Sequence, residues 1–100
     1  MKKNIVCYTF SPSVRFRDAE DTLMLSVMAV ESLFGDARVR LDASYRLDPL
    51  RSITVDGGTE VGSAVVKVFT RLLTREFGED SFRVRRAEAV AARNAEGCGV

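Results

Sequence analysis

The clearest pattern of apolar and polar positions lies between Thr59 and Phe77. Apolar residues recur there at helical spacing and share one face, at Val61, Val65, Val68 and Leu72. Polar residues occupy the opposite side, at Lys67, Thr70, Arg71 and Thr74. We predict a helix with Thr59 as its N-cap and Gly78 as its stop signal. The apolar arc is broader than one sheet contact needs, which predicts a second packing neighbour.

The chain begins with a short apolar segment that predicts a central strand. Residues Asn4 to Phe10 are rich in β-branched and aromatic side chains, and both faces of such a strand would be apolar. Ile5 and Cys7 would point one way, and Val6, Tyr8 and Phe10 the other. The pattern leaves open which set faces the helices.

A first helix is predicted from Asp18 to Phe34, with Asp18 as N-cap and Gly35 as stop. Its buried stripe would be Leu23, Val27, Val30 and Phe34. Met24 and Met28 lie off this stripe, and two interpretations are open. They can pack against the second helix, which we favour, or form a methionine-lined surface for a partner.

The remaining predicted elements are strands. From Ala37 to Leu47 apolar and polar residues alternate strictly, which predicts a long strand with one buried face. Asp48 and Pro49 would turn the chain into a third strand, Arg51 to Val55, to form a hairpin. Ser81 to Arg86 predicts a fourth strand, with Phe82 and Val84 inward. An alanine-rich stretch, Ala87 to Ala95, is compatible with a loose helix.

The order β-α-β-β-α-β predicts an α+β fold of the ferredoxin-like type. Both helices would lie on one face of a four-stranded antiparallel sheet whose first and third strands are central. We assign residues 1–90 to one domain and residues 91–100 to a flexible tail.

Composition excludes several kinds of chemistry. Hydrophobic residues make up 46% of the chain and charged residues 29%, as in an ordinary globular domain. The chain has no histidine and two cysteines, so it lacks the usual general base and a tetrahedral zinc site. A net charge of +1 gives weak global attraction to nucleic acid or membrane. We expect a cytoplasmic protein that is not an enzyme, binds no cofactor or metal, and does not span a membrane.

The open face of the sheet is the first candidate site. If Ile5 and Cys7 face the helices, aromatic residues would stand on that face beside strand arginines. The full candidate set is Tyr8, Phe10, Arg38, Arg40, Arg46, Arg83 and Arg85. We favour a non-enzymatic assembly module, homodimeric through this face or the sheet edge and open to another protein partner. The alternative is a platform for single-stranded nucleic acid, on which bases stack and phosphates pair with guanidinium groups.

The turn before the long helix is a weaker candidate. Gly57, Gly58 and Thr59 precede a helix N-terminus, where free amides can hold an anion. A tight turn that needs glycine is the simpler interpretation, because the phosphate-loop spacing is absent. The acidic residues Asp18, Glu20 and Asp21 are better explained by the helix dipole than by catalysis. Cys98, between two glycines, is interpreted as an incidental thiol.

Overall fold

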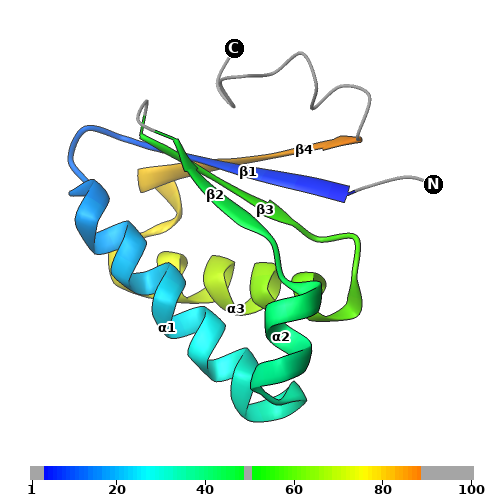
Figure 1. The fold of residues 1–100 in the computed structure, drawn as a ribbon. Helices are drawn as coiled ribbons and strands as arrows, with labels where there is room; N and C mark the ends of the chain where they lie inside the picture. Colours follow the sequence, from blue (N-terminus) through cyan, green and yellow to red (C-terminus); the bar gives the residue numbers. More distant parts are fainter. Residues whose placement is uncertain (1–3, 49–50, 89–100) are drawn as a thin grey trace.

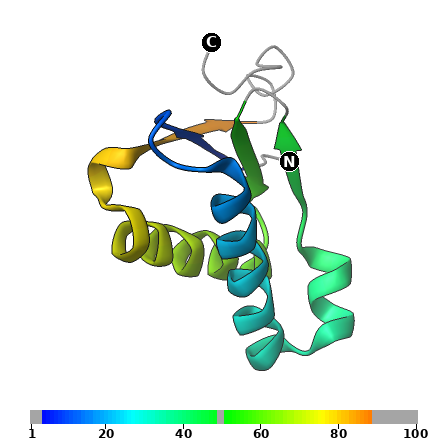
Figure 2. The ribbon, with the colours of Figure 1, turned by 90° about the vertical axis from the view of Figure 1, so that its left-hand side faces the viewer.

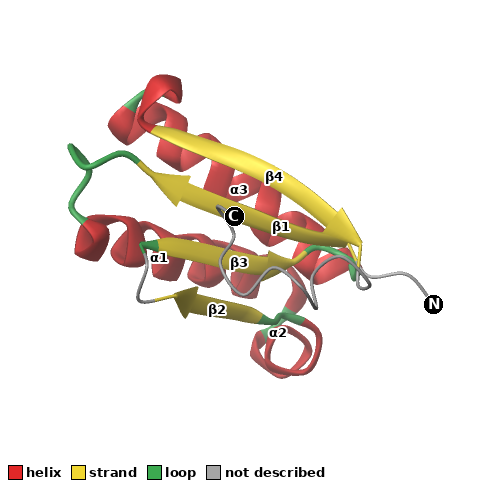
Figure 3. Cartoon of the chain, turned by 90° about the horizontal axis from the view of Figure 1, so that it is seen from above, coloured by secondary structure: helices red, strands yellow, loops and turns green. Residues whose placement is uncertain are grey.

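The computed structural model describes residues 4–48 and 51–88. The elements in chain order are β1 (Asn4–Phe10), α1 (Phe16–Phe34), α2 (Asp36–Asp42), β2 (Tyr45–Asp48), β3 (Ser52–Asp56), α3 (Glu60–Phe77), a 3-10 turn (Glu79–Ser81) and β4 (Phe82–Glu88). The four strands form an antiparallel sheet in the order β2-β3-β1-β4 (Figure 3). All three helices lie on one side of this sheet (Figure 1). The predicted α+β class and the central first and third strands are confirmed.

The bulkier side chains of β1 face the helices. Val6 and Tyr8 are fully buried and Phe10 is 9% exposed, all three in the hydrophobic core with the helices. Side chains alternate along a strand, so Ile5, Cys7 and Thr9 face the opposite side of the sheet. In the register, Tyr8 pairs with Ile53 of β3 and Val84 of β4, and these residues share its face.

The first helix starts earlier than predicted. It begins at Phe16, and the N-cap is Arg15, which makes no side-chain cap. Asp18 therefore lies in the first turn, where its charge suits the positive end of the helix dipole. Gly35 ends the helix as predicted, in a conformation with φ of 89° that favours glycine.

A third helix, α2, replaces most of the predicted second strand. The chain leaves α1 at Gly35 and immediately turns again over Asp36–Asp42, and only Tyr45–Asp48 is strand. Residues with strand-like alternation here also satisfy helical spacing, since Arg38 reaches Asp42 four residues on. Val39 is buried at 3% exposure, whereas Leu41 is 84% exposed instead of facing the core. The predicted strand Ala37–Leu47 was therefore wrong over its first half, and the exact predicted element order with two helices is not reproduced.

The second long helix follows its prediction closely. Thr59 caps α3 by accepting a hydrogen bond from the amide of Gly62 at 2.9 Å, and Gly78 ends the helix. The buried side is rotated slightly toward Phe69 and Leu73, with Val68 and Leu72 half-buried. The second packing neighbour is α1, which lies beside α3, while α2 contacts both α1 and the start of α3 (Figure 2).

The buried face of α1 carries two small polar residues, Thr22 and Ser26, at 6% and 0% exposure. Each hydroxyl donates a hydrogen bond to a carbonyl one turn earlier in the same helix. Thr22 reaches Asp18 at 2.9 Å and Ser26 reaches Thr22 at 2.9 Å. Both groups are thus satisfied inside α1 and need no partner from another element.

The predicted hairpin is confirmed, with β2 and β3 paired antiparallel. Beside it, Arg51 has a positive φ of 67°, which is unusual for a residue with a side chain. Its guanidinium group donates to the carbonyl oxygens of Ser11, at 3.1 Å, and of Val14. These bonds tie the hairpin to the loop between β1 and α1.

The last strand, β4, pairs with β1 along its length. Phe82 is buried as predicted, whereas Val84 lies on the helix-facing side of the strand but is 42% exposed. Ala87 and Glu88 belong to this strand, so the alanine-rich stretch does not start as a helix. The rest of that stretch, the predicted tail 91–100 and Cys98 lie outside the described residues.

Candidate functional site

The aromatic residues of the predicted open-face site lie in the core instead. Tyr8 packs edge-on against Phe69 of α3, with ring centroids 4.7 Å apart, and Phe10 packs against Phe16 at 6.1 Å. A base cannot stack on rings that are enclosed by helices. The prediction that Tyr8 and Phe10 form a platform on the open face is therefore wrong.

The hydroxyl group of Tyr8 shows why this orientation is stable. It lies 2.7 Å from the hydroxyl of Thr70 and donates to the carbonyl oxygen of Val66 at 3.3 Å, both on α3. Burial raises the pKa of the Tyr8 phenol, while the bond to Thr70 and the charge of Arg86 act in the opposite direction. A buried phenol with both partners is well satisfied on the helix side.

The five predicted arginines do not form one cluster. Arg38 and Arg40 belong to α2 and not to a strand. Arg46 lies on β2 and pairs in register with Thr54, on the open face, whereas Arg83 and Arg85 lie on β4. Because β2 and β4 are opposite edges, Arg46 is separated from the other two by roughly 14 Å of sheet.

The turn before α3 does not offer its glycine amides to an anion. The amide of Gly57 donates to the carbonyl of Asn4 at 2.6 Å, and that of Gly58 to the carboxylate of Asp56 at 2.9 Å. Thr59 is the helix cap, which leaves the predicted cradle without the two glycine donors it relied on. Gly57 also lies close to β1, and a Cβ there would stand 3.3 Å from the Asn4 carbonyl oxygen.

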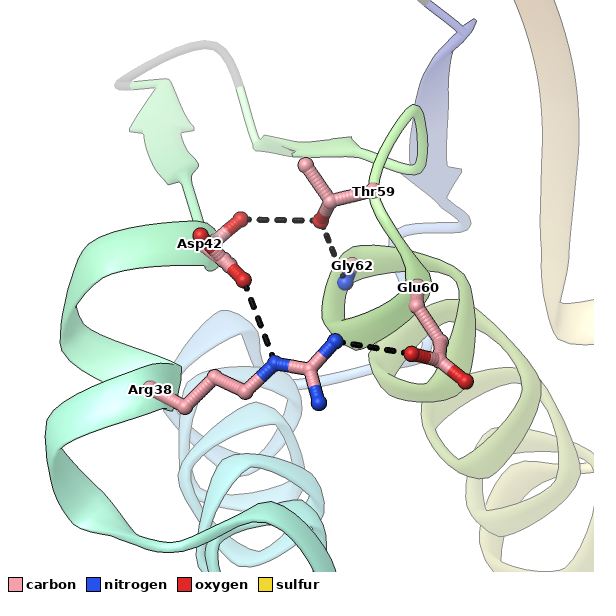
Figure 4. A network of polar contacts seen from close by, with 5 residues as sticks. All are labelled: Arg38, Asp42, Thr59, Glu60 and Gly62. Atoms are coloured by element: carbon pink, nitrogen blue, oxygen red, sulfur yellow. Dashed lines mark hydrogen bonds and ion pairs between the residues drawn. The ribbon is translucent and has the colours of Figure 1, made fainter.

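A polar network joins α2 to the start of α3 (Figure 4). Arg38 donates to Glu60 at 2.7 Å and to Asp42 at 3.4 Å, and its guanidinium lies 5.0 Å from the ring centre of Phe34. The hydroxyl of Thr59 donates to the carbonyl oxygen of Asp42 at 2.9 Å. Hydrogen bonding to Glu60 raises the pKa of Arg38, which stays charged. These contacts hold α2 in place and contain no acid–base pair.

Large apolar side chains are exposed on α1. Met24 is 38% exposed, Leu25 58% and Met28 60%, so the two methionines are not buried against the second helix as expected. No charged residue occurs between Asp21 and Glu31 in the sequence. The outer side of α1 is therefore apolar where a surface helix is normally polar.

A second feature was not singled out from the sequence. An open groove of about 640 Å³ runs between α3 and β4. It is lined by Val66, Lys67, Thr70, Arg71, Thr74, Arg75 and Arg86. The signal in the sequence is the spacing of four residues between the three α3 cations, but Arg86 lies in another element. Only the fold brings these four positive charges together.

Two kinds of site are missing from the described residues. Among residues 4–48 and 51–88, no group of three or more histidine, cysteine, aspartate or glutamate side chains is placed to hold a metal ion. None of the helices in this part has the length and apolar character to cross a bilayer. No protein-family model, no curated protein and no solved structure matches this chain.

Proposed function

We propose that this protein is a non-enzymatic assembly module that forms a homodimer through the outer side of α1. The observation that carries the proposal is the exposure of Met24, Leu25 and Met28 on one uncharged stretch of helix. Exposed apolar side chains gathered in this way typically mark an interaction surface. Methionine suits such a surface because its flexible thioether side chain adapts to a facing side chain.

The ends of the helix favour a second copy as the partner. Arg17, Asp21, Met24, Met28 and Glu31 follow alternating spacings of four and three residues and form one stripe. Arg17 and Glu31 are each seven residues from Met24. An antiparallel pair of α1 helices centred on Met24 thus brings Arg17 of each copy to Glu31 of the other. Neither residue forms an ion pair within the described part of the chain.

The structure makes the sheet a weaker candidate for the dimer interface than the sequence suggested. Its open face has lost Tyr8 and Phe10 to the core. It carries Ile5, Thr9 and arginines instead, together with Cys7, which is only 7% exposed. The exposed edge β2 has four residues, of which Asp48 is buried. These features give little apolar area to bury, whereas α1 supplies three large side chains.

We also interpret the architecture as a ferredoxin-like arrangement with an inserted helix. Supporting this are the antiparallel order β2-β3-β1-β4, the position of α1 and α3 on the same side, and the hairpin between β2 and β3. In this interpretation α2 is an insertion between α1 and β2.

The dimer is tested by measuring mass across a dilution series with sedimentation velocity. We expect twice the chain mass of 11.1 kDa for the wild type and a monomer for Met24→Glu, because the register sets Met24 of each copy against the other and two like charges would then meet at the centre of the interface. Ser44→Glu adds the same charge at an exposed position outside α1 and should leave the dimer intact. A wild type that is monomeric at every concentration would overturn the proposal.

Charge exchange tests the antiparallel geometry. Arg17→Glu and Glu31→Arg should each weaken the dimer, since each sets like charges against one another at both ends of the stripe. The double variant should recover the wild-type dissociation constant to within about threefold, because coupled pairs compensate in a double-mutant cycle. A double variant as weak as the two single losses combined would reject this register.

A further inference from the structure

We propose that the groove between α3 and β4 binds the phosphodiester backbone of a nucleic acid without reading its bases. Its two walls supply positive charge from different elements. Lys67, Arg71 and Arg75 come from α3, and Arg86 comes from the helix-facing side of β4, where it pairs in register with Val6. This site is separate from the proposed dimer surface on α1.

The charges of the groove are available to a ligand. None of the four side chains forms an ion pair with a described residue, and Lys67, Arg71, Arg75 and Arg86 are all exposed. Unpaired arginine and lysine side chains in a groove focus positive potential there. The Thr70 hydroxyl is already bonded to Tyr8, and the Thr74 hydroxyl to the carbonyl of Thr70. The positive side chains are therefore the groups that would attract an anionic ligand.

The nearest acidic residues of α3 do not cancel this charge. Glu76 follows Lys67 by nine residues, which places it on the other side of the helix. Glu60 precedes Lys67 by seven residues, two turns toward the N-terminus, and it is already bonded to Arg38 at 2.7 Å. The described residues that line the groove include no carboxylate.

The spacing of the charges favours a linear polyanion over a single phosphate. Successive cations on α3 are four residues apart, or about 6 Å along the axis, and the three span about 12 Å. They do not converge on one point as donors around a single bound phosphate do. A chain of phosphates can meet Lys67, Arg71 and Arg75 in turn while Arg86 contacts it from the other wall.

The lining also argues against a membrane and against base recognition. Helices that bind membranes place large apolar residues beside their basic ones, whereas Thr70 and Thr74 stand between these cations. None of the described lining residues is aromatic, so they offer stacked bases no platform. Binding should therefore be insensitive to sequence and governed by charge.

The test uses fluorescence anisotropy with a labelled single-stranded oligonucleotide of mixed sequence, and with its duplex, at several salt concentrations. We expect log K to fall with log salt with a slope of about −2 to −3 for three to four contacts to a single strand. Oligonucleotides of different sequence should bind alike. Failure to bind either form at low salt, or tighter binding to vesicles containing phosphatidylserine, would overturn the proposal.

Matched arginine variants locate the site. At a salt concentration of about 0.1 M, Arg71→Gln should weaken binding about fivefold and reduce the slope by about 0.7, the effect of one lost phosphate contact. Arg40→Gln removes the same charge from the exposed surface of α2 and should leave affinity unchanged within about twofold. Equal losses in the two variants would show attraction to overall charge and would reject the groove.

Discussion

The hydroxyl groups of Tyr8 and Thr70 lie 2.7 Å apart and join the central strand β1 to α3. Thr70 also lines the basic groove, so this contact links the core to the groove wall. Tyr8 is fully buried and donates as well to the carbonyl oxygen of Val66. Its position is therefore determined by both packing and hydrogen bonding.

Replacing Tyr8 with phenylalanine should keep the packing against Phe69 and remove the hydroxyl. We expect a loss of about 1–2 kcal/mol in the free energy of unfolding, since a buried hydrogen-bonded group is deleted and Thr70 loses its partner. Urea denaturation measures this value. Thr70→Val in the Tyr8→Phe background should cost little more, because the two hydroxyls stabilise the fold as a pair.

The stability of the wild type should fall at high pH because of the same phenol. Burial raises the pKa of Tyr8, so the folded state prefers the neutral form more strongly than the unfolded state does. This contribution is fully present below a pH of about 10, the ordinary tyrosine value, and is lost as pH rises above it. Urea denaturation at several pH values should show the difference between wild type and Tyr8→Phe shrinking above pH 10. A constant difference across that range would contradict the assignment.

The cap of α3 offers a second test. Thr59 accepts from the amide of Gly62 and donates to the carbonyl of Asp42, each at 2.9 Å. Thr59→Ala should lower the free energy of unfolding by about 1–2 kcal/mol, as for other helix caps, because α3 loses its cap and α2 loses a contact. Thr59→Ser retains the hydroxyl and should remain within about 0.5 kcal/mol of the wild type. Equal stability of the two variants would show that the hydroxyl contributes nothing.

Gly62 is required by close packing in the first turn of α3. A Cβ at this position would overlap the carbonyl oxygen of Asp56 and stand 3.0 Å from the Thr59 hydroxyl oxygen. Gly62→Ala should therefore destabilise the protein by about 1–3 kcal/mol, although alanine is the better helix former. Ser63→Ala, at the next position, gains helix propensity without the overlap and should not lower the melting temperature.

Unlike Gly62, Ser26 should tolerate replacement by alanine, because its buried hydroxyl is bonded only within α1, to the carbonyl of Thr22. Ser26→Ala removes the hydroxyl donor together with the free-energy cost of burying it, and alanine is the better helix former. We therefore expect the free energy of unfolding to change by no more than about 0.5 kcal/mol. Ser26→Leu must enlarge a fully buried site and should lower the melting temperature by several degrees. A large loss in the alanine variant would reveal a role for the hydroxyl outside α1.

Local signals predicted the parts of the fold that depend on neighbouring residues. The bounds of β1, the cap and stop of α3 and the hairpin of β2 with β3 follow from apolar spacing, Thr59, Gly78 and the turn residues. The predicted strand from Ala37 to Leu47 was wrong over its first half, because alternation of apolar and polar residues in the sequence does not require a strand. Gly35 and the bonds of Arg38 to Asp42 and Glu60 are compatible with a helix there, and Glu60 lies far along the chain.

The candidate sites depended on choices that the sequence leaves open. Both faces of β1 are apolar, and the fold turns the bulkier one toward the helices, where the Tyr8 hydroxyl finds partners on α3. The groove was not predictable because Arg86 joins the α3 cations only through the tertiary fold. By contrast, the partner surface on α1 was already an open alternative, which the exposure of Met24 and Met28 now favours.

Arg51 couples the folding of the hairpin to that of the loop after β1. A positive φ is energetically unfavourable for a residue with a side chain. The hydrogen bonds of the Arg51 guanidinium offset this cost. They reach the carbonyl oxygens of Ser11 and Val14, which lie 40 and 37 positions earlier in the chain. The hairpin conformation and the docking of the loop after β1 therefore stabilise one another. Loosening either segment should also expose the other to proteases, so the two will open as a single unit in native-state hydrogen exchange.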